Sequence, residues 1–358
     1  MGFLQHLFFL HNMKKQEIKP VIGVVGLGNF GTLAASILSK HFEVLIYHYR
    51  HKEENVKRAE RIGAKLIELE EIKNCDIVIL TTPISETEDT IKKIAPLMKD
   101  GSLLIDTCSV KVGPCDWLVK NTPKTIEILG THPMFGPTTS KFNFDEQTWN
   151  LNGLQIVLCP LRISRKHLQS IEQFLKSLNL KIITTSPKEH DKQNAKTLSF
   201  VHFVGRSLLA AGIGPQEIYT PGYSDLLKIL PHTTSDNWKL FYDMNNFNPY
   251  SDVIREKFRD AGFEIEEKII KHRQESELDA NRELIDIIDT RIMKLLKKRF
   301  ECSKNIGDYK KERGMKIIDP KREDEIIKNK IKKSDLDGKF IKELYKIIFN
   351  ESYKSQKK

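Results

Sequence analysis

A glycine-rich turn near the N-terminal end constrains the fold of this chain more than any other feature. Residues 26–31 read GLGNFG, follow a short apolar run at residues 21–25, and open a helical pattern that continues to Lys40. In a GxGxxG turn the first glycine permits the tight turn, the second lets a pyrophosphate approach the backbone, and the third lets helix pack on strand. The helix N-terminus then stabilises the phosphate charge. The sequence therefore predicts a Rossmann domain whose cofactor contacts come from Gly26, Gly28, Asn29, Phe30 and Gly31.

The choice of dinucleotide depends on the end of the second strand, about 20 residues beyond the first glycine. Further strands are expected at residues 43–49, 76–80 and 102–105. An acidic residue at the end of the second strand would bind the ribose 2′-hydroxyl of NAD, but residues 47–51 read YHYRH and contain no carboxylate. Arg50 favours the 2′-phosphate of NADP over NAD, and Glu53 lies slightly too late to replace the missing acid.

Two further loops are expected at the carboxyl ends of strands, where open α/β sheets bind ligands. Residues 106–111 read DTCSVK, and residues 130–137 read GTHPMFGP. A lone histidine in a loop is more often structural than catalytic. His132, however, is followed by Pro133 in a glycine-spaced loop that would present one imidazole, and such a group can bond a substrate hydroxyl near neutral pH.

These two motifs together resemble the prephenate and arogenate dehydrogenases, and the resemblance covers about residues 20–272. It continues through residues 189–191 (EHD), 201–206 (VHFVGR) and 220–223 (TPGY), which look closest to the arogenate dehydrogenase branch. The resemblance implies an oxidative decarboxylation in which the carbon bearing the 4-hydroxyl gives up a hydride while the ring carboxylate leaves as carbon dioxide.

The same resemblance implies roles for individual residues. His132 would accept the hydroxyl proton, and Ser109 would orient His132 or the hydroxyl. His202 and Arg206 lie four residues apart on a predicted helix and could bind a substrate carboxylate, although a core or surface role is an equal alternative. His190, at the start of that helix, is expected to be supporting or structural. Lys239 lies in the helix where prephenate-specific relatives place an arginine, so the choice between prephenate and arogenate stays open.

The last eighty residues indicate a separate helical domain. Residues 276–313 contain no proline, and apolar side chains recur in steps of seven or fourteen at Leu278, Ile285, Ile292 and Ile306. A helix of that length would run roughly 55 Å and needs a partner helix, most simply from a second subunit. Arg299 interrupts the apolar seam, either as a surface arginine or as an anion ligand.

Residues 278–356 resemble the all-helical chorismate mutases, which rearrange chorismate to prephenate without a nucleophile. A basic dimerisation bundle is the alternative. The resemblance assigns Arg299 and Arg282 of a partner chain to the two substrate carboxylates, with Lys310 and Gln356 at the ether oxygen. It assigns the ring hydroxyl to Glu323, and the support of the pocket to Asp319, Arg322 and Ser352.

The predicted organisation is an α/β Rossmann domain, an all-α dehydrogenase domain and a C-terminal, intertwined all-α mutase domain. The expected boundaries are an extension at 1–19, then 20–186, 187–273 and 276–358. The net charge is +10, and residues 275–358 carry 23 Lys and Arg against 17 Asp and Glu. Because these charges alternate in sign, a dianionic substrate explains the excess better than nucleic acid does.

Cysteine usage and the length of the apolar runs set the expected location. Five scattered cysteines without a CxxC pair argue against a disulfide framework or a zinc site. No apolar run reaches the ~20 residues needed to span a membrane. A cytoplasmic homodimer without a metal is therefore expected. Two alternatives remain. One is a β-hydroxyacid dehydrogenase, a class that uses a lysine followed four residues later by an asparagine; here Lys192 is followed by Lys196, and Lys196 by Phe200. The other is an NADP-sensing protein with a basic interaction helix.

Overall fold

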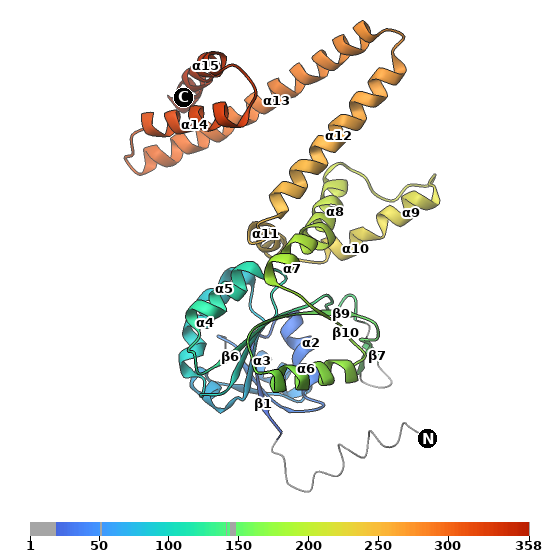
Figure 1. Ribbon diagram of the computed structural model, residues 1–358, viewed down its shortest axis with the longest axis vertical. Helices are drawn as coiled ribbons and strands as arrows, with labels where there is room; N and C mark the ends of the chain where they lie inside the picture. Colours follow the sequence, from blue (N-terminus) through green and yellow to red (C-terminus); the bar gives the residue numbers. More distant parts are fainter. Residues whose placement is uncertain (1–18, 51, 141, 144–147, 358) are drawn as a thin grey trace. The chain divides into compact units, whose positions relative to one another are not determined.

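The computed structural model describes residues 19–50, 52–140, 142–143 and 148–357 (Figure 1). The chain divides into two compact units, residues 1–258 and 259–358. Nearly all of the predicted extension at 1–19 lies outside the described residues. The boundaries predicted at residues 186 and 273 stay predictions.

An eight-stranded sheet forms the centre of the first unit, in the order β10-β9-β6-β5-β4-β1-β2-β3. Its first six strands in the chain pair in parallel, whereas β9 runs antiparallel to β6 and pairs in parallel with β10. The strands are β1 Val21–Val25, β2 Glu43–Tyr47, β3 Lys65–Ile67, β4 Ile77–Leu80, β5 Leu103–Asp106, β6 Glu127–Pro133, β9 Gln155–Arg162 and β10 Lys181–Thr184. This order confirms the predicted Rossmann fold and brings the ends of β1, β4, β5 and β6 to one edge of the sheet.

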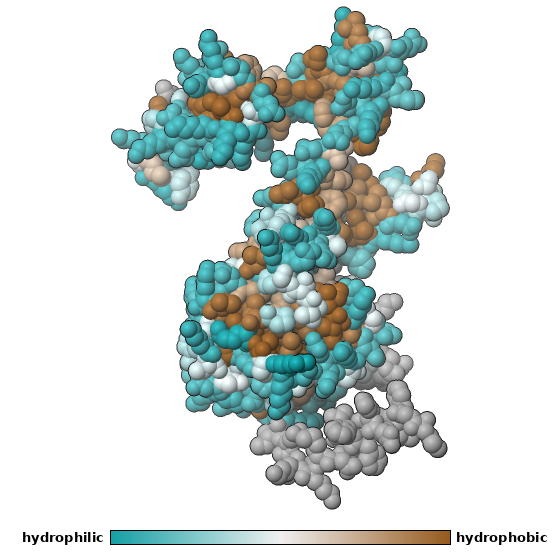
Figure 2. Space-filling model, viewed as in Figure 1, coloured by the Kyte–Doolittle hydropathy of each residue, from teal (hydrophilic) through white to brown (hydrophobic). Residues whose placement is uncertain are grey.

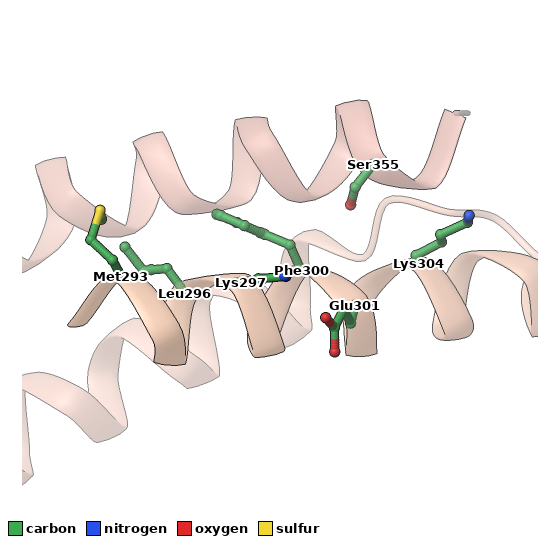
Figure 3. Close-up of a pocket in the computed structure, with 7 residues that line it drawn as sticks. All are labelled: Met293, Leu296, Lys297, Phe300, Glu301, Lys304 and Ser355. Carbon is green, nitrogen blue, oxygen red and sulfur yellow. The ribbon is translucent and has the colours of Figure 1, made fainter. Parts of the chain in front are cut away.

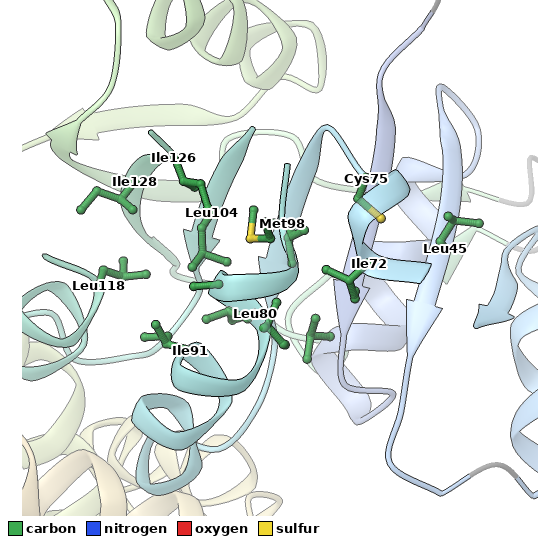
Figure 4. Close-up of a cluster of buried hydrophobic side chains, with 14 of the residues drawn as sticks. Leu45, Ile72, Cys75, Leu80, Ile91, Met98, Leu104, Leu118, Ile126 and Ile128 are labelled. Carbon is green, nitrogen blue, oxygen red and sulfur yellow. The ribbon is translucent and has the colours of Figure 1, made fainter. Parts of the chain in front are cut away.

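Helices cover both faces of this sheet because alternate strand residues point to opposite sides. Val25, Val78 and Leu104 enter the cluster drawn in Figure 4, which also contains side chains of α4 (Ile84–Ile94) and α5 (Val112–Asn121). The other face packs on α2 (Asn29–Leu38), α3 (Glu53–Arg61) and α6 (Arg165–Ser177). A short pair, β7 (Phe142–Asn143) and β8 (Thr148–Trp149), lies apart from the sheet.

The sequence predicts a loop over residues 130–137, and this prediction is wrong for its first four residues. Gly130, Thr131, His132 and Pro133 belong to β6, because β9 pairs with them in antiparallel register, with His132 opposite Val157. His132 is therefore the next-to-last residue of β6, a strand inside the sheet. A strand restrains its backbone more than a glycine-spaced loop would.

A helical region follows the sheet. One helical run comprises α7 (Pro187–Asn194), a π-helical turn (Ala195–Ser199) and α8 (Phe200–Ala210). His190 thus lies in α7, two elements before the helix that carries His202 and Arg206. Then come α9 (Pro221–Leu227), α10 (Ile229–Thr234), α11 (Trp238–Asn246) and α12 (Ser251–Arg273). Gly205 brings α8 against α10, since a Cβ there would lie 2.1 Å from the Thr233 hydroxyl.

The C-terminal helices are α13 (Glu277–Glu312), α14 (Pro320–Lys333) and α15 (Gly338–Lys357). The long helix predicted from residue 276 to 313 is confirmed. Its apolar seam is open to solvent in the single chain, as Leu278 and Ile285 are each more than half exposed. Figure 2 shows apolar side chains gathered along the surface of α13. No helix within the described residues is both long and apolar enough to cross a membrane.

Candidate active sites

The glycine turn has the geometry that a dinucleotide requires. Gly26 adopts φ 110° and donates its N–H to the Tyr47 carbonyl at 2.9 Å, so the turn is anchored to β2. A Cβ on Gly31 would lie 2.3 Å from the Gly26 carbonyl oxygen, so only glycine lets α2 start this close to β1. A Cβ on Gly28 would meet nothing within 4 Å, so the backbone there is accessible to a pyrophosphate. The residues present fit the cofactor.

The end of β2 carries a stacked basic and aromatic group. The Arg50 guanidinium lies 4.9 Å from the centroid of the Tyr49 ring, and the His48 and Tyr49 rings are 4.8 Å apart. Glu53 begins α3 and pairs with Lys57 at 2.6 Å, so its carboxylate is engaged on its own helix. His51 lies outside the described residues.

His132 is buried at the carboxyl end of β6, and its partner is a second histidine. His132 Nδ1 lies 2.9 Å from His190 Nε2, and His190 Nδ1 lies 2.7 Å from Asp191 Oδ1. Ser109, expected to orient His132 or the hydroxyl, makes no bond to the imidazole, and its buried Oγ has no partner among the described residues. The orientation of His132 is set by α7, while the Ser109 hydroxyl is left available to a ligand.

Helix α7 also holds the loop that carries Ser109. The Asp191 carboxylate accepts the backbone N–H of Lys111 at 2.7 Å and of Val112 at 2.8 Å, which caps the start of α5. Asn194 donates its side-chain amide to the Ser109 carbonyl at 2.5 Å. The two segments predicted from the sequence are thus joined through α7, which follows the first by about 80 residues and His132 by 58.

A buried ion pair lies beneath this site. Lys111 and Asp106 are both fully buried; the Lys111 ammonium pairs with Asp106 Oδ1 and donates to the Thr131 carbonyl at 2.5 Å. Burial alone would lower the pKa of the Lys111 amine, but the Asp106 carboxylate, together with Cys115 and Cys108, acts in the opposite direction and the pKa is raised. Burial, followed by His190 and Lys111, lowers the pKa of His132 well below its usual range. His132 is therefore neutral, and able to accept a proton, at pH 7.

His202 and Arg206 meet at the start of α11. His202 Nε2 lies 3.8 Å from Asp236 Oδ2, and Arg206 donates to the Asp236 carbonyl at 2.7 Å while its guanidinium lies 4.2 Å from the Trp238 ring centroid. Burial lowers the pKa of His202, with Asp236 acting in the opposite direction. No hydrogen bond joins this group to His132 among the described residues. Its buried His202 Nδ1 and Arg206 Nε have no partner there and could serve a ligand.

Lys239 stands apart from both groups. Its ammonium forms an ion pair with Glu86 of α4, and both side chains are about half exposed. Nearby, Asp243 of α11 accepts the Ser85 backbone N–H and hydroxyl at 3.1 and 2.8 Å. In this structure Lys239 ties α11 to α4 and does not reach the histidines, so its role at the substrate stays a prediction.

The C-terminal unit brings four predicted residues toward one face between α13 and α15. Arg299 donates to the Ser352 hydroxyl at 2.6 Å and lies 5.6 Å from the Phe349 ring centroid. Gln356, one helical turn beyond Ser352, donates to the Ser303 carbonyl at 3.0 Å, and its buried Oε1 has no partner among the described residues. Lys310, eleven residues after Arg299 on the same face, donates to the Ile317 carbonyl at 2.8 Å.

A glycine at position 307 permits this close approach of α13 and α15. A Cβ on Gly307 would lie 2.8 Å from Gln356 Cγ and 3.3 Å from Gln356 Cα. Any larger residue at position 307 would push α15 away from α13. Gly307 therefore sets the depth at which the Gln356 amide enters the site.

The other predicted mutase residues are more exposed. Asp319 caps α14 by accepting the backbone N–H of Arg322 at 3.1 Å, and the Arg322 side chain pairs with Glu325 at 3.2 Å. Partial burial, then Asp324 and Asp319, raise the pKa of Glu323. Arg282 pairs with Asp279 at 3.5 Å and precedes Arg299 by about 25 Å along α13.

A hollow of about 500 Å³ on α13 and α15 is separate from this cluster (Figure 3). Its lining comes from Met293, Leu296, Lys297, Phe300, Glu301, Lys304 and Ser355. None of the predicted mutase residues is among them. On a helix of 3.6 residues per turn, Lys297 and Lys304 face roughly 100° or more away from Arg299 and Lys310.

Sequence reasoning missed Asp191, Asn194, Asp106 and the side chain of Lys111, and placed His190 only as a supporting residue. The EHD triplet was a visible signal, because His190, Asp191 and Asn194 share one face of a short helix. No local pattern indicated that the lysine of the SVK motif would be fully buried.

A dinucleotide turn, a buried imidazole at the carboxyl edge of the same sheet and a helical region behind it define a Rossmann-type dehydrogenase fold. Residues 33–184 match the family model "Prephenate dehydrogenase, nucleotide-binding domain", residues 207–281 match "TYRAAT1-like, C-terminal domain", and residues 281–357 match "Chorismate mutase type II". Residues 33–184 therefore form a prephenate dehydrogenase nucleotide-binding domain, and residues 281–357 form a type II chorismate mutase domain.

Individual relatives agree with this assignment. Arogenate dehydrogenase 2, chloroplastic, of Arabidopsis thaliana is 32% identical over 237 residues, which are 64% of this chain and 64% of that protein. A probable arogenate/prephenate dehydrogenase of Methanocaldococcus jannaschii is 29% identical over 72% of this chain and 57% of its own length. The chain thus spans about three fifths of these curated relatives.

Solved structures support the fold. Prephenate dehydrogenase from A. aeolicus, crystallised with hydroxyphenyl propionate and NAD+, aligns with a TM-score of 0.58 at 19% identity, covering 79% of this chain and 99% of that one. Synechocystis arogenate dehydrogenase aligns with a TM-score of 0.54 at 20% identity, covering 76% and 99%.

The buried ion pair predicts a large stability effect. Lys111→Met should destabilise the first unit by about 3–5 kcal/mol, because it leaves the Asp106 charge buried without its partner. All three tryptophans, Trp117, Trp149 and Trp238, belong to this unit, so tryptophan fluorescence during urea unfolding reports on it alone. Lys120→Met, which removes an exposed lysine paired with Asp116, is the control and should leave the midpoint nearly unchanged. Equal midpoints for the two variants would contradict this account.

Proposed function

We propose that the chain is a bifunctional enzyme of tyrosine biosynthesis. One site rearranges chorismate to prephenate, and the other carries out the NADP-dependent oxidative decarboxylation of prephenate or its amino analogue arogenate. The observation that carries the proposal is the neutral, buried His132 at the same sheet edge as the glycine turn. The separate Arg299, Ser352 and Gln356 group supports the second activity.

At the dehydrogenase site His132 accepts the proton of the substrate 4-hydroxyl as the carboxylate leaves and the ring becomes aromatic. The Ser109 hydroxyl, free of protein partners, binds the substrate hydroxyl or the cofactor. His202 and Arg206 bind a substrate carboxylate. NADP, held by residues 26–31 and Arg50, supplies the hydride acceptor when bound.

The mutase site stabilises a conformer and a developing charge. Arg299, held by Ser352, binds one chorismate carboxylate, while Lys310 and Gln356 stabilise negative charge growing on the ether oxygen. Glu323 binds the ring hydroxyl, and Asp319 and Arg322 support the pocket. Gln356 is uncharged, so it can donate a hydrogen bond without prior protonation.

The second carboxylate calls for a partner chain. Arg282 lies about 25 Å from Arg299 along one straight helix, too far to contact the same small molecule. The exposed apolar seam of α13 would pack on the same seam of a second copy, which would place the partner's Arg282 at this pocket. We therefore propose an intertwined homodimer, located in the cytoplasm, where the five cysteines stay reduced as the free thiols seen here.

A coupled assay tests the whole proposal. Chorismate and NADP are supplied with and without an amino donor and an aminotransferase for prephenate, and the aromatic product and NADPH are measured. A 4-hydroxyphenyl product supports both activities. NADP binding without turnover of chorismate, prephenate or arogenate would favour the alternative of a cofactor-sensing protein.

The lowered pKa of His132 predicts the pH dependence of hydride transfer. Because the neutral imidazole is the active form, dehydrogenase kcat/KM should be level at pH 7 and fall only well below pH 6.5, as His132 becomes protonated. His132→Asn should lose this acid limb and about 10²–10⁴-fold in rate, with NADP affinity nearly unchanged. A decline centred at or above pH 6.5 would contradict the burial of this base.

Arg50 predicts the cofactor preference. Initial rates should be higher with NADP than with NAD, and Arg50→Ala should weaken NADP binding by about 10–100-fold, the loss of a charge-assisted bond of ~1.5–3 kcal/mol. Affinity for NAD should change little, because NAD lacks the 2′-phosphate. Lys57→Ala, on the neighbouring helix, is the control. An NAD-preferring wild type would refute the assignment.

Arg299→Ala separates the two sites. Mutase kcat/KM should fall by about 10²-fold or more, since a charge-assisted contact used in the transition state is lost. Dehydrogenase activity on prephenate or arogenate and thermal stability should persist. Lys298→Ala, an exposed neighbour paired with Glu301 at 3.2 Å, should be unaffected. Near-normal mutase kinetics in Arg299→Ala would exclude Arg299 from the site.

A further inference from the structure

The imidazole of His132 is the last member of a chain of polar groups that begins at a helix N-terminus. Asp191 accepts the N–H groups of Lys111 and Val112 at the start of α5, as well as His190 Nδ1 at 2.7 Å. His190 Nε2 then lies 2.9 Å from His132 Nδ1. Asp191, His190 and His132 are all buried, so water does not compete for these bonds.

The Asp191 carboxylate fixes which atom donates and which accepts in each of these hydrogen bonds. A carboxylate that already accepts two backbone N–H groups at a helix N-terminus is an acceptor, so His190 must carry its proton on Nδ1. In a neutral imidazole the other nitrogen then holds only a lone pair. His190 Nε2 is therefore an acceptor, and His132 must donate to it from Nδ1.

Nε2 is then the one nitrogen of the His132 ring that carries no proton. We propose that Asp191 and His190 are positioning residues that fix the tautomer of His132, leaving Nε2 as the atom that accepts the substrate proton. This rests on the proposed dehydrogenase function. In the step the hydroxyl O–H bond breaks and an N–H bond forms at Nε2, while His190 and Asp191 keep their protonation states.

The opposite arrangement would disable the site. If His190 carried its proton on Nε2, it would donate to His132 Nδ1, and His132 would hold its proton on Nε2, facing the substrate. That arrangement leaves Asp191 Oδ1 against an unprotonated nitrogen, a repulsive contact in a buried place.

A direct test reads the tautomers in the full-length protein without substrate. Histidine is labelled with ¹⁵N, and the signals of His132 and His190 are assigned by their loss in His132→Asn and His190→Gln. We expect both residues to be protonated on Nδ1 and unprotonated on Nε2 near pH 7. A protonated Nε2 on His132 would overturn the proposal whether or not the dehydrogenase assignment is correct.

A kinetic test separates positioning from space filling. His190→Leu keeps the volume but removes the acceptor, so kcat on arogenate or prephenate should fall by about 10²-fold. His190→Gln can present its amide oxygen to His132 Nδ1 and should recover about tenfold of that loss. NADP affinity should be unchanged in both variants, which shows that the first unit is folded.

His167→Leu is the matched control, because it removes an imidazole from exposed α6, where His167 bonds Glu127 at 2.7 Å. Equal rates for His190→Leu and His190→Gln would show that His190 only fills space, and would overturn its positioning role. If the wild type turns over neither substrate, the proposed function fails while the tautomer assignment still stands or falls on the NMR result.

Discussion

The ion pair between Lys111 and Asp106 is the interaction on which the proposed dehydrogenase site depends. It lies wholly out of water at the carboxyl edge of the sheet, and the lysine also donates to the Thr131 carbonyl of β6. Asp106 ends β5 and Lys111 precedes α5, so one pair joins two strands to a helix. Desolvating two charges is costly and is offset only when each finds partners. Moving Lys111 away from these partners would leave a charge buried and unpaired, so the pair restrains this edge of the sheet, including His132 next to Thr131.

Helix α7 links this edge of the sheet to the helical region through hydrogen bonds. Asp191 caps α5, Asn194 holds the Ser109 carbonyl, and the Asp191 carbonyl itself accepts the Asn248 amide at 3.0 Å. The π-helical turn at Ala195–Ser199 follows directly, and such turns are frequent at functional sites. In this chain that turn separates the face carrying His190 from the face carrying His202 and Arg206.

Much of the fold could be predicted because its signals are local. The glycine turn, the buried strands and the unbroken heptad-like run of α13 each depend on neighbouring residues. The features that could not be predicted depend on distant ones. His132 belongs to a strand because β9 returns antiparallel beside it, and no residue near 132 records that pairing. The same is true of Lys111, whose burial depends on a strand twenty residues later, and of His190, whose role depends on a partner 58 residues before it. Motif resemblance placed His132 and Ser109, but the support beneath them came from tertiary structure.

Gly307 has a consequence for how the mutase domain can vary. The contact between α13 and α15 is closest where a side chain is absent, and Gln356 occupies that space. Every single replacement of this glycine adds at least a methyl group to a filled position. A glycine inside a helix costs about 0.5–1 kcal/mol relative to alanine. Position 307 is therefore one where the helix propensity gained with alanine is opposed by overpacking against Gln356, so glycine is the residue that keeps α15 this close to α13.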